Sequence, residues 1–164
     1  LQNPEVSATL YECNDSNWYT SDCNDCGASD EVRVYGLSDF SPTWSGSGDE
    51  TGNDNVCIYR SGGGTHDILV TATTESGDFV LQDGSSNSIP ITVYWNDATG
   101  TSGRVAITPA DDPSIDDATG AHTSSSTCSG GSTANFSFVI SSSDIQSMPA
   151  GTYSATFSIT VSAP

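Results

Sequence analysis

The sequence predicts an all-β protein built as an antiparallel sandwich. Short segments alternate apolar with polar residues, and turn residues recur roughly every ten positions. No segment sustains the 3.6-residue periodicity of an amphipathic helix. The clearest strand is the last one, where Tyr153, Phe157, Ile159 and Val161 alternate with Ser and Thr. About seven to nine such strands favour an immunoglobulin-like sandwich, with a jelly roll as the alternative.

The first half of the chain predicts four strands separated by polar segments. Residues 13–30 are Cys-rich and aperiodic, which indicates a loop or arm. Residues 38–55 form a long polar connection, and three glycines from Gly62 turn the chain. The strands are expected at Val6, Ala8 and Leu10; at Val32, Val34 and Leu37; at residues 56–59; and at Ile68, Val70 and Ala72.

The second half predicts further strands of the same kind. Residues 111–131 are acidic and rich in Ser and Gly, which indicates a loop. One helical turn is expected over 141–145, with Ser142 or Ser143 as its cap. The strands are expected at residues 79–81; at Ile89, Ile91, Val93 and Trp95; at Val105 and Ile107; at Phe136, Phe138 and Ile140; and at the C-terminus.

The charge balance excludes two classes of partner. The chain has 3 basic and 21 acidic residues among 164, a formal charge of -18. Such a polyanion repels phosphate backbones and anionic lipids, so neither nucleic-acid binding nor membrane-surface binding is expected. The acidity suits a saline environment, where salt screens self-repulsion, or is an ordinary acidic surface. No apolar run is long enough to span a bilayer.

Five cysteines in a short, Ser-rich chain indicate an oxidising compartment and therefore an exported protein, with Leu1 following a removed signal peptide. Five is an odd number, so one thiol is left over or pairs with another chain. A disulfide between Cys23 and Cys26 needs a tight loop. A disulfide from Cys13 to Cys26, or to Cys23, is therefore favoured within the arm.

We expect no catalytic residues, no metal ion and no cofactor, because no group of residues forms a specific motif. His66 and His122 lie outside any nucleophile or metal motif. Cys23 and Cys26 lack the second ligand pair of a structural zinc site. The acidic clusters, at residues 53–55, 111–112 and 116–117, do not match the spacing of a calcium-binding EF-hand loop, so a solvated acidic surface is expected. We therefore expect that the protein is not an enzyme.

Three aromatic residues offer an alternative function. Trp18, Tyr19 and Trp44 lie in polar segments, and together they could form a platform on which sugars stack. The competing interpretation is that these side chains close one end of the sandwich. A carbohydrate-binding module or tip adhesin domain is therefore kept as the alternative function.

Five blocks of sequence, in order, resemble the pilin-type domain of the spore-coat-protein-U-like group of archaic chaperone–usher pili. The resemblance covers roughly residues 31–164, and the Cys-rich segment 13–30 departs from the pattern. The blocks are EVRVYGLSDF at 31–40 with TWSGSGD at 43–49 and NVCIY at 55–59; FVL at 79–81; IPITVYWND at 89–97; TCSGG at 127–131; and PAGTYS at 149–154.

The resemblance implies a sandwich that lacks its last strand. A periplasmic chaperone would fill the resulting groove first, and the N-terminal extension of a neighbouring subunit would then replace it, so that the protein is a structural pilus subunit for adhesion or biofilm formation. An unpaired C-terminal strand edge fits this expectation, since it is open to a strand added from another chain. The expected donor residues are Pro4, Val6, Ala8 and Leu10; the expected acceptor groove comprises Tyr153, Phe157, Ile159, Val161, Phe136 and Phe138. The alternative for residues 5–11 is an ordinary strand of their own domain or a disordered tail.

The resemblance further implies a disulfide between Cys57 and Cys128 and an extracellular location on a cell-surface pilus, reached through the periplasm. The implied partners are identical or homologous pilins, with the chaperone and an outer-membrane usher during assembly. The chain then divides into a donor extension at 1–12, a Cys-rich arm at 13–30 and a pilin-type domain at 31–164. Head-to-tail strand donation does not close on itself, so it produces a filament.

Overall fold

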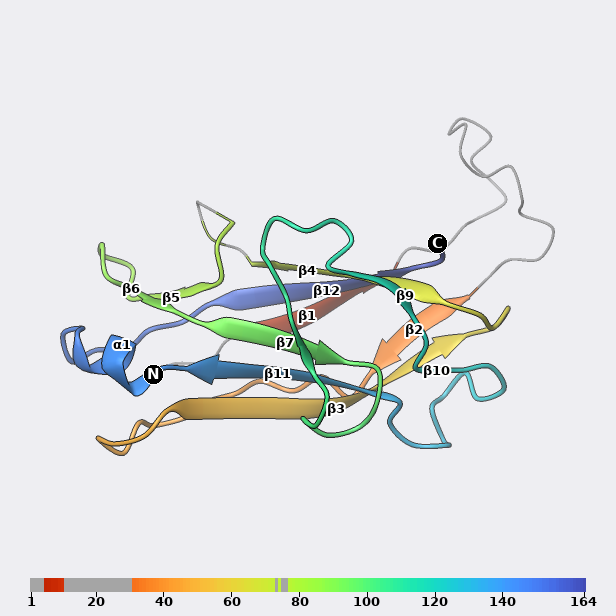
Figure 1. The fold of residues 1–164 in the computed structure, drawn as a ribbon, viewed down its shortest axis with the longest axis horizontal. Helices are drawn as coiled ribbons and strands as arrows, with labels where there is room; N and C mark the ends of the chain where they lie inside the picture. The colour runs from red at the N-terminus through yellow and green to blue at the C-terminus, as the bar shows by residue number, and fades with distance from the viewer. Residues whose placement is uncertain (1–4, 11–30, 73, 75–76) are drawn as a thin grey trace.

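The computed structural model describes the backbone of residues 5–10, 31–72, 74 and 77–164, and the side chains of these residues from 31 onward. The regular secondary structure of this part is almost all β-strand, in mainly antiparallel sheets, as the alternating pattern predicts (Figure 1). The described residues contain no helix that is both long enough and apolar enough to cross a membrane.

The first sheet has four strands in the order β1-β12-β4-β9. Its pairings β12–β4 and β4–β9 are antiparallel, whereas β1 pairs with β12 in parallel. The C-terminal strand therefore lies inside this sheet, between β4 and the strand nearest the N-terminus. The bounds are Glu5–Leu10 for β1, Thr156–Ser162 for β12, His66–Ala72 for β4 and Ile115–Ala118 for β9.

The second sheet follows the order β10-β3-β11-β7-β8, with β2 also paired to β3. Its long strand β3 pairs with β11 through its first half and with β2 and β10 through its second half. The bounds are Val32–Tyr35 for β2, Glu50–Arg60 for β3, Thr92–Asn96 for β7, Val105–Ala106 for β8, Ala121–His122 for β10 and Ala134–Ile140 for β11. A hairpin of β5 (Val80–Gln82) and β6 (Ser88–Pro90) and the helix α1 (Ser142–Gln146) complete the domain.

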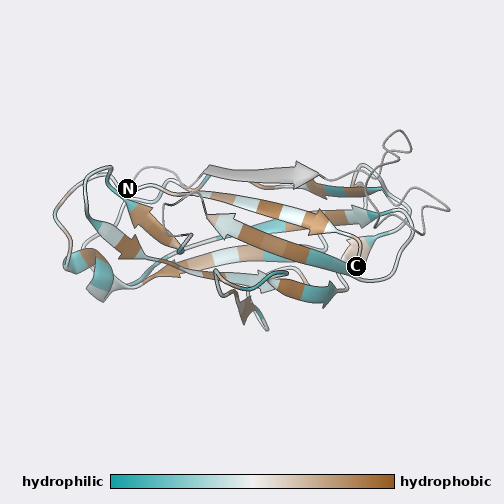
Figure 2. Ribbon diagram, turned by 90° about the horizontal axis from the view of Figure 1, so that it is seen from above, coloured by the Kyte–Doolittle hydropathy of each residue, from teal (hydrophilic) through white to brown (hydrophobic). Residues whose placement is uncertain are grey.

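The core lies between the two sheets, which form two layers in Figure 2. Phe157 of β12 and Phe136 of β11 meet across it, with ring centroids 6.3 Å apart. Along β12, buried apolar residues alternate with half-buried Ser and Thr, because successive side chains of a strand point to opposite faces. The strand periodicity of the sequence therefore identifies the core-facing side chains of β12 correctly.

Four local predictions are wrong. The single strand expected from Ile89 to Trp95 is two strands, because β6 pairs with β5 whereas β7 pairs with β11 of the second sheet. Residues 50–55 belong to β3 rather than to a polar connection, because β11 supplies backbone partners along their whole length. Within the loop expected at 111–131, β9 pairs with β4 and β10 pairs with β3. The cap of α1 is Ser141 rather than Ser142 or Ser143, and its side-chain oxygen accepts a hydrogen bond from the Ser143 amide.

One disulfide joins Cys57 of β3 to Cys128, in the loop before β11. This is the pair that the pilin resemblance implies. It closes a sequence separation of 71 residues and holds that loop against β3. The remaining cysteines, Cys13, Cys23 and Cys26, lie outside the described residues.

Candidate functional site

The candidate site is the edge of β12 that faces β1. On its other edge β12 pairs with β4, with Phe157 opposite Ala72 and Ser162 opposite Asp67. Beside β1 the register runs from Glu5 opposite Thr156 to Leu10 opposite Val161. The strand next to the C-terminal strand is therefore supplied by the opposite end of the sequence.

The residues of the predicted acceptor groove lie on both sheets. Phe157, Ile159 and Val161 of β12 are fully buried, and so are Phe136 and Phe138 of β11. Phe157 contacts the ring of Phe79 as well, with 5.6 Å between centroids. Tyr153 lies apart from this group, before β12 begins; its ring is buried and its hydroxyl donates a hydrogen bond to the carbonyl oxygen of Pro149.

The predicted donor residues have a definite backbone position. Val6, Ala8 and Leu10 lie in β1 opposite Phe157, Ile159 and Val161 respectively. Pro4 lies outside the described residues. The partner of this strand is β12 of the same chain, so the edge that we expected to be open is paired within the molecule.

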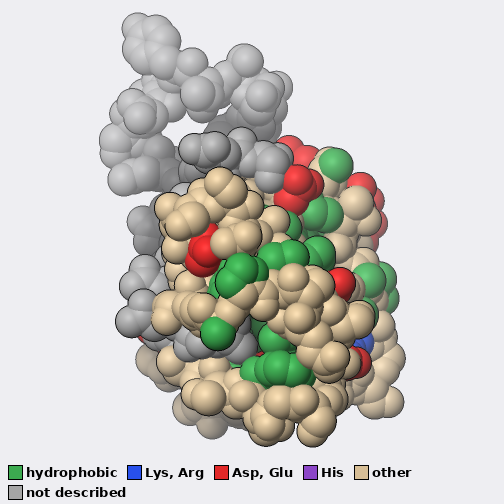
Figure 3. Space-filling view, turned by 90° about the vertical axis from the view of Figure 1, so that its left-hand side faces the viewer, with side chains coloured by type: hydrophobic (Ala, Val, Ile, Leu, Met, Phe, Trp, Pro, Cys, Tyr) green, Lys and Arg blue, Asp and Glu red, His purple; other side chains and the backbone are tan. Residues whose placement is uncertain are grey.

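One end of the sandwich carries an apolar cavity of about 430 Å³. Apolar side chains gather on this end of the molecule, around a hollow in the space-filling view (Figure 3). Burial raises the pKa of Tyr153 in its wall. The cavity lies where β12 begins, because Tyr153 precedes Thr156 by three positions. It is lined by Thr43, Trp44, Ile89, Ile145, Gln146, Met148, Pro149, Ala150, Gly151 and Tyr153.

Trp44 is the only predicted sugar-binding aromatic within the described residues, since Trp18 and Tyr19 lie outside them. It is half-buried in the wall of the cavity, and its indole N–H donates to the carbonyl oxygen of Gly48 at 2.9 Å. Ile145 and Met148 line the same cavity and were not among the predicted site residues. Their three-residue spacing in and after the short helix was the available signal.

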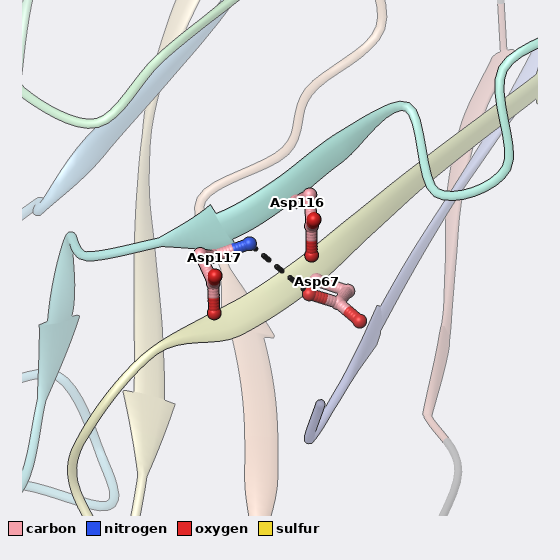
Figure 4. Close-up of side chains that lie close together, drawn as sticks. All are labelled: Asp67, Asp116 and Asp117. Carbon is pink, nitrogen blue, oxygen red and sulfur yellow. Dashed lines mark hydrogen bonds between the residues drawn. The ribbon is translucent and has the colours of Figure 1, made fainter.

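The opposite end of the β12 edge is acidic. Asp67, Asp116 and Asp117 bring one carboxylate oxygen each within 4.8 Å of one another, from β4 and β9 (Figure 4). The amide of Asp117 donates to Asp67, and Thr65 donates to the carboxylate of Asp117. These hydrogen bonds within the cluster account for its geometry, so we assign it no bound ion.

The two histidines have different environments. His66 at the start of β4 has no exposed surface, and neither ring nitrogen has a hydrogen-bond partner among the described residues. Burial lowers its pKa, because the charged form would lose its hydration. The ring of His122 is hydrogen-bonded to the carbonyl oxygen of Gly131 at 2.9 Å. The described residues place no Ser or Cys within hydrogen-bond distance of either ring.

The site therefore consists of a strand edge with an apolar end and an acidic end. Its chemistry is backbone pairing and apolar burial. Comparison of the chain with family models, with curated proteins and with solved structures gives no match. The functional inference consequently depends on the residues and the fold themselves.

Proposed function

We propose that the protein is a structural subunit of an extracellular filament, polymerising by exchange of its N-terminal strand. The pilin resemblance of residues 31–164 motivates this function. The single observation that supports it most strongly is the position of β1: residues near the N-terminus pair with the C-terminal strand along the full length of β1. In the proposed filament, β1 of one subunit takes this place on β12 of the next.

The strand order supports an immunoglobulin-like assignment. An immunoglobulin constant-type sandwich has one sheet of four strands and one of three. The order β2-β3-β11-β7 is compatible with the four-stranded sheet. The pair β4-β12 is compatible with two strands of the three-stranded sheet. In this assignment β1 is the seventh strand, and it alone lies out of sequence order. Because β1 comes from the opposite end of the chain, a neighbouring subunit can provide the same strand.

Pairing of β1 within the chain is compatible with exchange between chains. A swapped element makes the same backbone hydrogen bonds in both states, so the exchange requires little free energy. Parallel pairs are also slightly less stable than antiparallel pairs, which favours release. Residues 11–31 separate β1 from β2 in the sequence, so no short turn ties β1 to the strand that follows it.

A charge-placement experiment tests the donor assignment. We compare the double variants Val6→Asp/Leu10→Asp and Ser7→Asp/Thr9→Asp in the full chain, since both add two charges to β1. Strand alternation puts the first pair on the predicted donor face and the second pair on the other face. Electron microscopy should show filaments for the wild type and for the second variant, and none for the first.

Deletion of residues 1–11 supplies a second test. The truncated chain should bind to the filament end as an acceptor and stop growth, because it offers β12 but no donor strand. Filaments of normal length formed by the truncated protein alone would contradict the donor assignment. A wild-type protein that stays monomeric at every concentration would contradict the filament function itself.

A self-contained carbohydrate-binding module is the second candidate function. The observation that favours it is the pairing of β1 with β12 in one chain, which leaves no open edge on β12. In that case the cavity beside Trp44 is the candidate sugar site. Trp44→Ala should then abolish binding to immobilised polysaccharide without changing the oligomeric state, whereas the filament function predicts no saccharide binding in either protein.

A further inference from the structure

Both backbone edges of β12 are occupied within one chain. All 6 residues of β1 pair with β12 in an unbroken register, and β4 pairs with the other edge of β12. A strand from a second molecule therefore finds no free backbone edge on β12. It can pair there only after β1 has left.

The apolar side chains of β12 are covered as well. Phe157, Ile159 and Val161 are at most 1% exposed, whereas an acceptor groove without a donor strand would leave such side chains in contact with water. The large apolar side chains that are exposed in the described part of the chain are Tyr35 and Val105, and neither belongs to β12. The described surface is therefore that of a completed sandwich.

The strand β1 lies where the two sheets approach one another. It pairs with β12 of the first sheet and contacts β2 of the second sheet, and β12 contacts β2 as well. Removal of β1 would therefore uncover both the backbone edge of β12 and the margin between the sheets. An uncovered strand edge of this kind favours pairing with a strand from another molecule.

A neighbouring molecule has to compete with the strand that is already in place. Its β1 has the same sequence and offers β12 the same strand, but the β1 that is in place belongs to the same chain as β12. Such an intramolecular partner has an effective concentration on the order of 1 mM. In a solution of the protein at about 10 μM, the chain's own strand is therefore favoured by about a hundredfold.

We propose that β1 is an autoinhibitory cap, which occupies β12 of its own chain and keeps the dilute protein monomeric. This proposal rests on the filament function proposed above and adds its regulation. Strand exchange between copies begins when the protein concentration approaches the effective concentration of the chain's own strand. Filament growth is thereby confined to places where many copies accumulate.

Hydrogen exchange in the unmodified protein tests the cap. Peptide mass spectrometry follows the amides of β1 in the dilute monomer, whose size is checked by light scattering. We expect the amides that pair with β12 to exchange at least about tenfold more slowly than in an unstructured chain, equally at about 1 μM and about 20 μM protein. Exchange at the unstructured rate would overturn the cap. Protection that rises with concentration would overturn it too, because the pairing would then be with another copy.

A strand-capture experiment tests the cap by substitution. The probe is a fluorescent peptide of residues 1–12, and three full-length proteins are compared: the wild type, Val6→Asp/Leu10→Asp and Ser7→Asp/Thr9→Asp. A cap reduces the apparent affinity for the peptide in proportion to the fraction of molecules that are open. The first variant weakens the cap, so it should bind the peptide at least about tenfold more tightly than the wild type. The second variant should bind the peptide as the wild type does.

The outcomes separate the cap from the filament function. Equal and measurable affinity of the three proteins for the peptide overturns the cap and retains strand donation. A peptide that binds none of the three proteins contradicts the donor assignment and, with it, the filament function. A protected monomer that forms no filament at any concentration also contradicts the filament function, and β1 is then an ordinary strand of its own domain. Far-UV circular dichroism of both variants provides the folding control.

Discussion

His66 links the stability of the folded domain to pH. Its folded-state pKa lies below the ordinary value of 6.5, because burial disfavours the charged ring. The charged groups that act on it are Asp97, Arg60 and Asp67, of which Arg60 also lowers the pKa and the two carboxylates raise it. In the unfolded chain the ring takes up a proton near pH 6.5, whereas the folded protein resists this uptake.

We therefore predict that the free energy of unfolding falls as the pH is lowered from about 7 to about 5. His66→Leu, which removes the titrating group at similar volume, should flatten the dependence in this window. Urea unfolding followed by tryptophan fluorescence at each pH measures the effect, and identical slopes for wild type and His66→Leu would contradict it.

Gly52 shows how one missing side chain can decide local packing. It lies in β3 opposite Phe138, and a Cβ atom built on it would overlap the ring of Phe138 and approach the ring of Phe40 to 2.8 Å. These two rings pack edge to face with their centroids 5.0 Å apart. A larger residue at this position would separate them.

Gly52→Ala should therefore lower the free energy of unfolding by about 1–3 kcal/mol, the usual cost of overpacking a core. Gly151→Ala is the control, because its nearest neighbour would be an atom of Tyr153 at an ordinary 3.6 Å. Chemical denaturation of the two variants gives the comparison. Equal stability of Gly52→Ala and the wild type would show that both rings move aside without cost.

At the scale of elements, the Cys57–Cys128 disulfide connects β3 to the loop that leads into β11. It closes 71 residues that include β4 to β10, and on the chain-entropy model such a bridge stabilises the fold by about 4 kcal/mol. We predict that the double variant Cys57→Ala/Cys128→Ala loses about that much free energy of unfolding. The triple variant with alanine at Cys13, Cys23 and Cys26 should keep the free energy of unfolding of the wild type if the arm contributes no stability to the sandwich.

The measurement is urea unfolding under non-reducing conditions, with the slope of the transition checked for each protein. If the free energy of unfolding of the double variant is close to that of the wild type, the sheet pairings alone hold the loop in place. A matching loss in the triple variant would instead assign the arm a structural role in the folded domain.

At the scale of the whole molecule, net charge should control association. Two copies, each with a formal charge of -18, repel one another until salt screens them. We predict that filament assembly accelerates strongly between about 0.05 M and about 0.5 M NaCl, where the screening length falls to a few ångströms. Light scattering follows the rate, and elongation that is independent of NaCl would contradict the prediction.

The failures of sequence reasoning have a common cause. The residues of β3 from Glu50 to Asn55 are mostly polar and show no apolar alternation. They form a strand because β11 pairs with them, and the side-chain amide of Asn135 also donates a hydrogen bond to the side-chain oxygen of Asn55. The same holds for β9, whose acidic sequence pairs with β4. These residues form strands because they pair with a strand that is distant in the sequence, and the local pattern of residues does not contain that information.

What the sequence determined by itself was the class of structure and the inward face of its best strands. Alternation in the C-terminal segment placed Phe157, Ile159 and Val161 in the core, because the two-residue period of a strand depends only on local backbone geometry. The tertiary structure alone decided that β1 pairs with β12, that an apolar cavity adjoins one end of that edge, and that three aspartates gather at the other. Each of these features joins residues far apart in the chain, so it depends on the order and register of the strands.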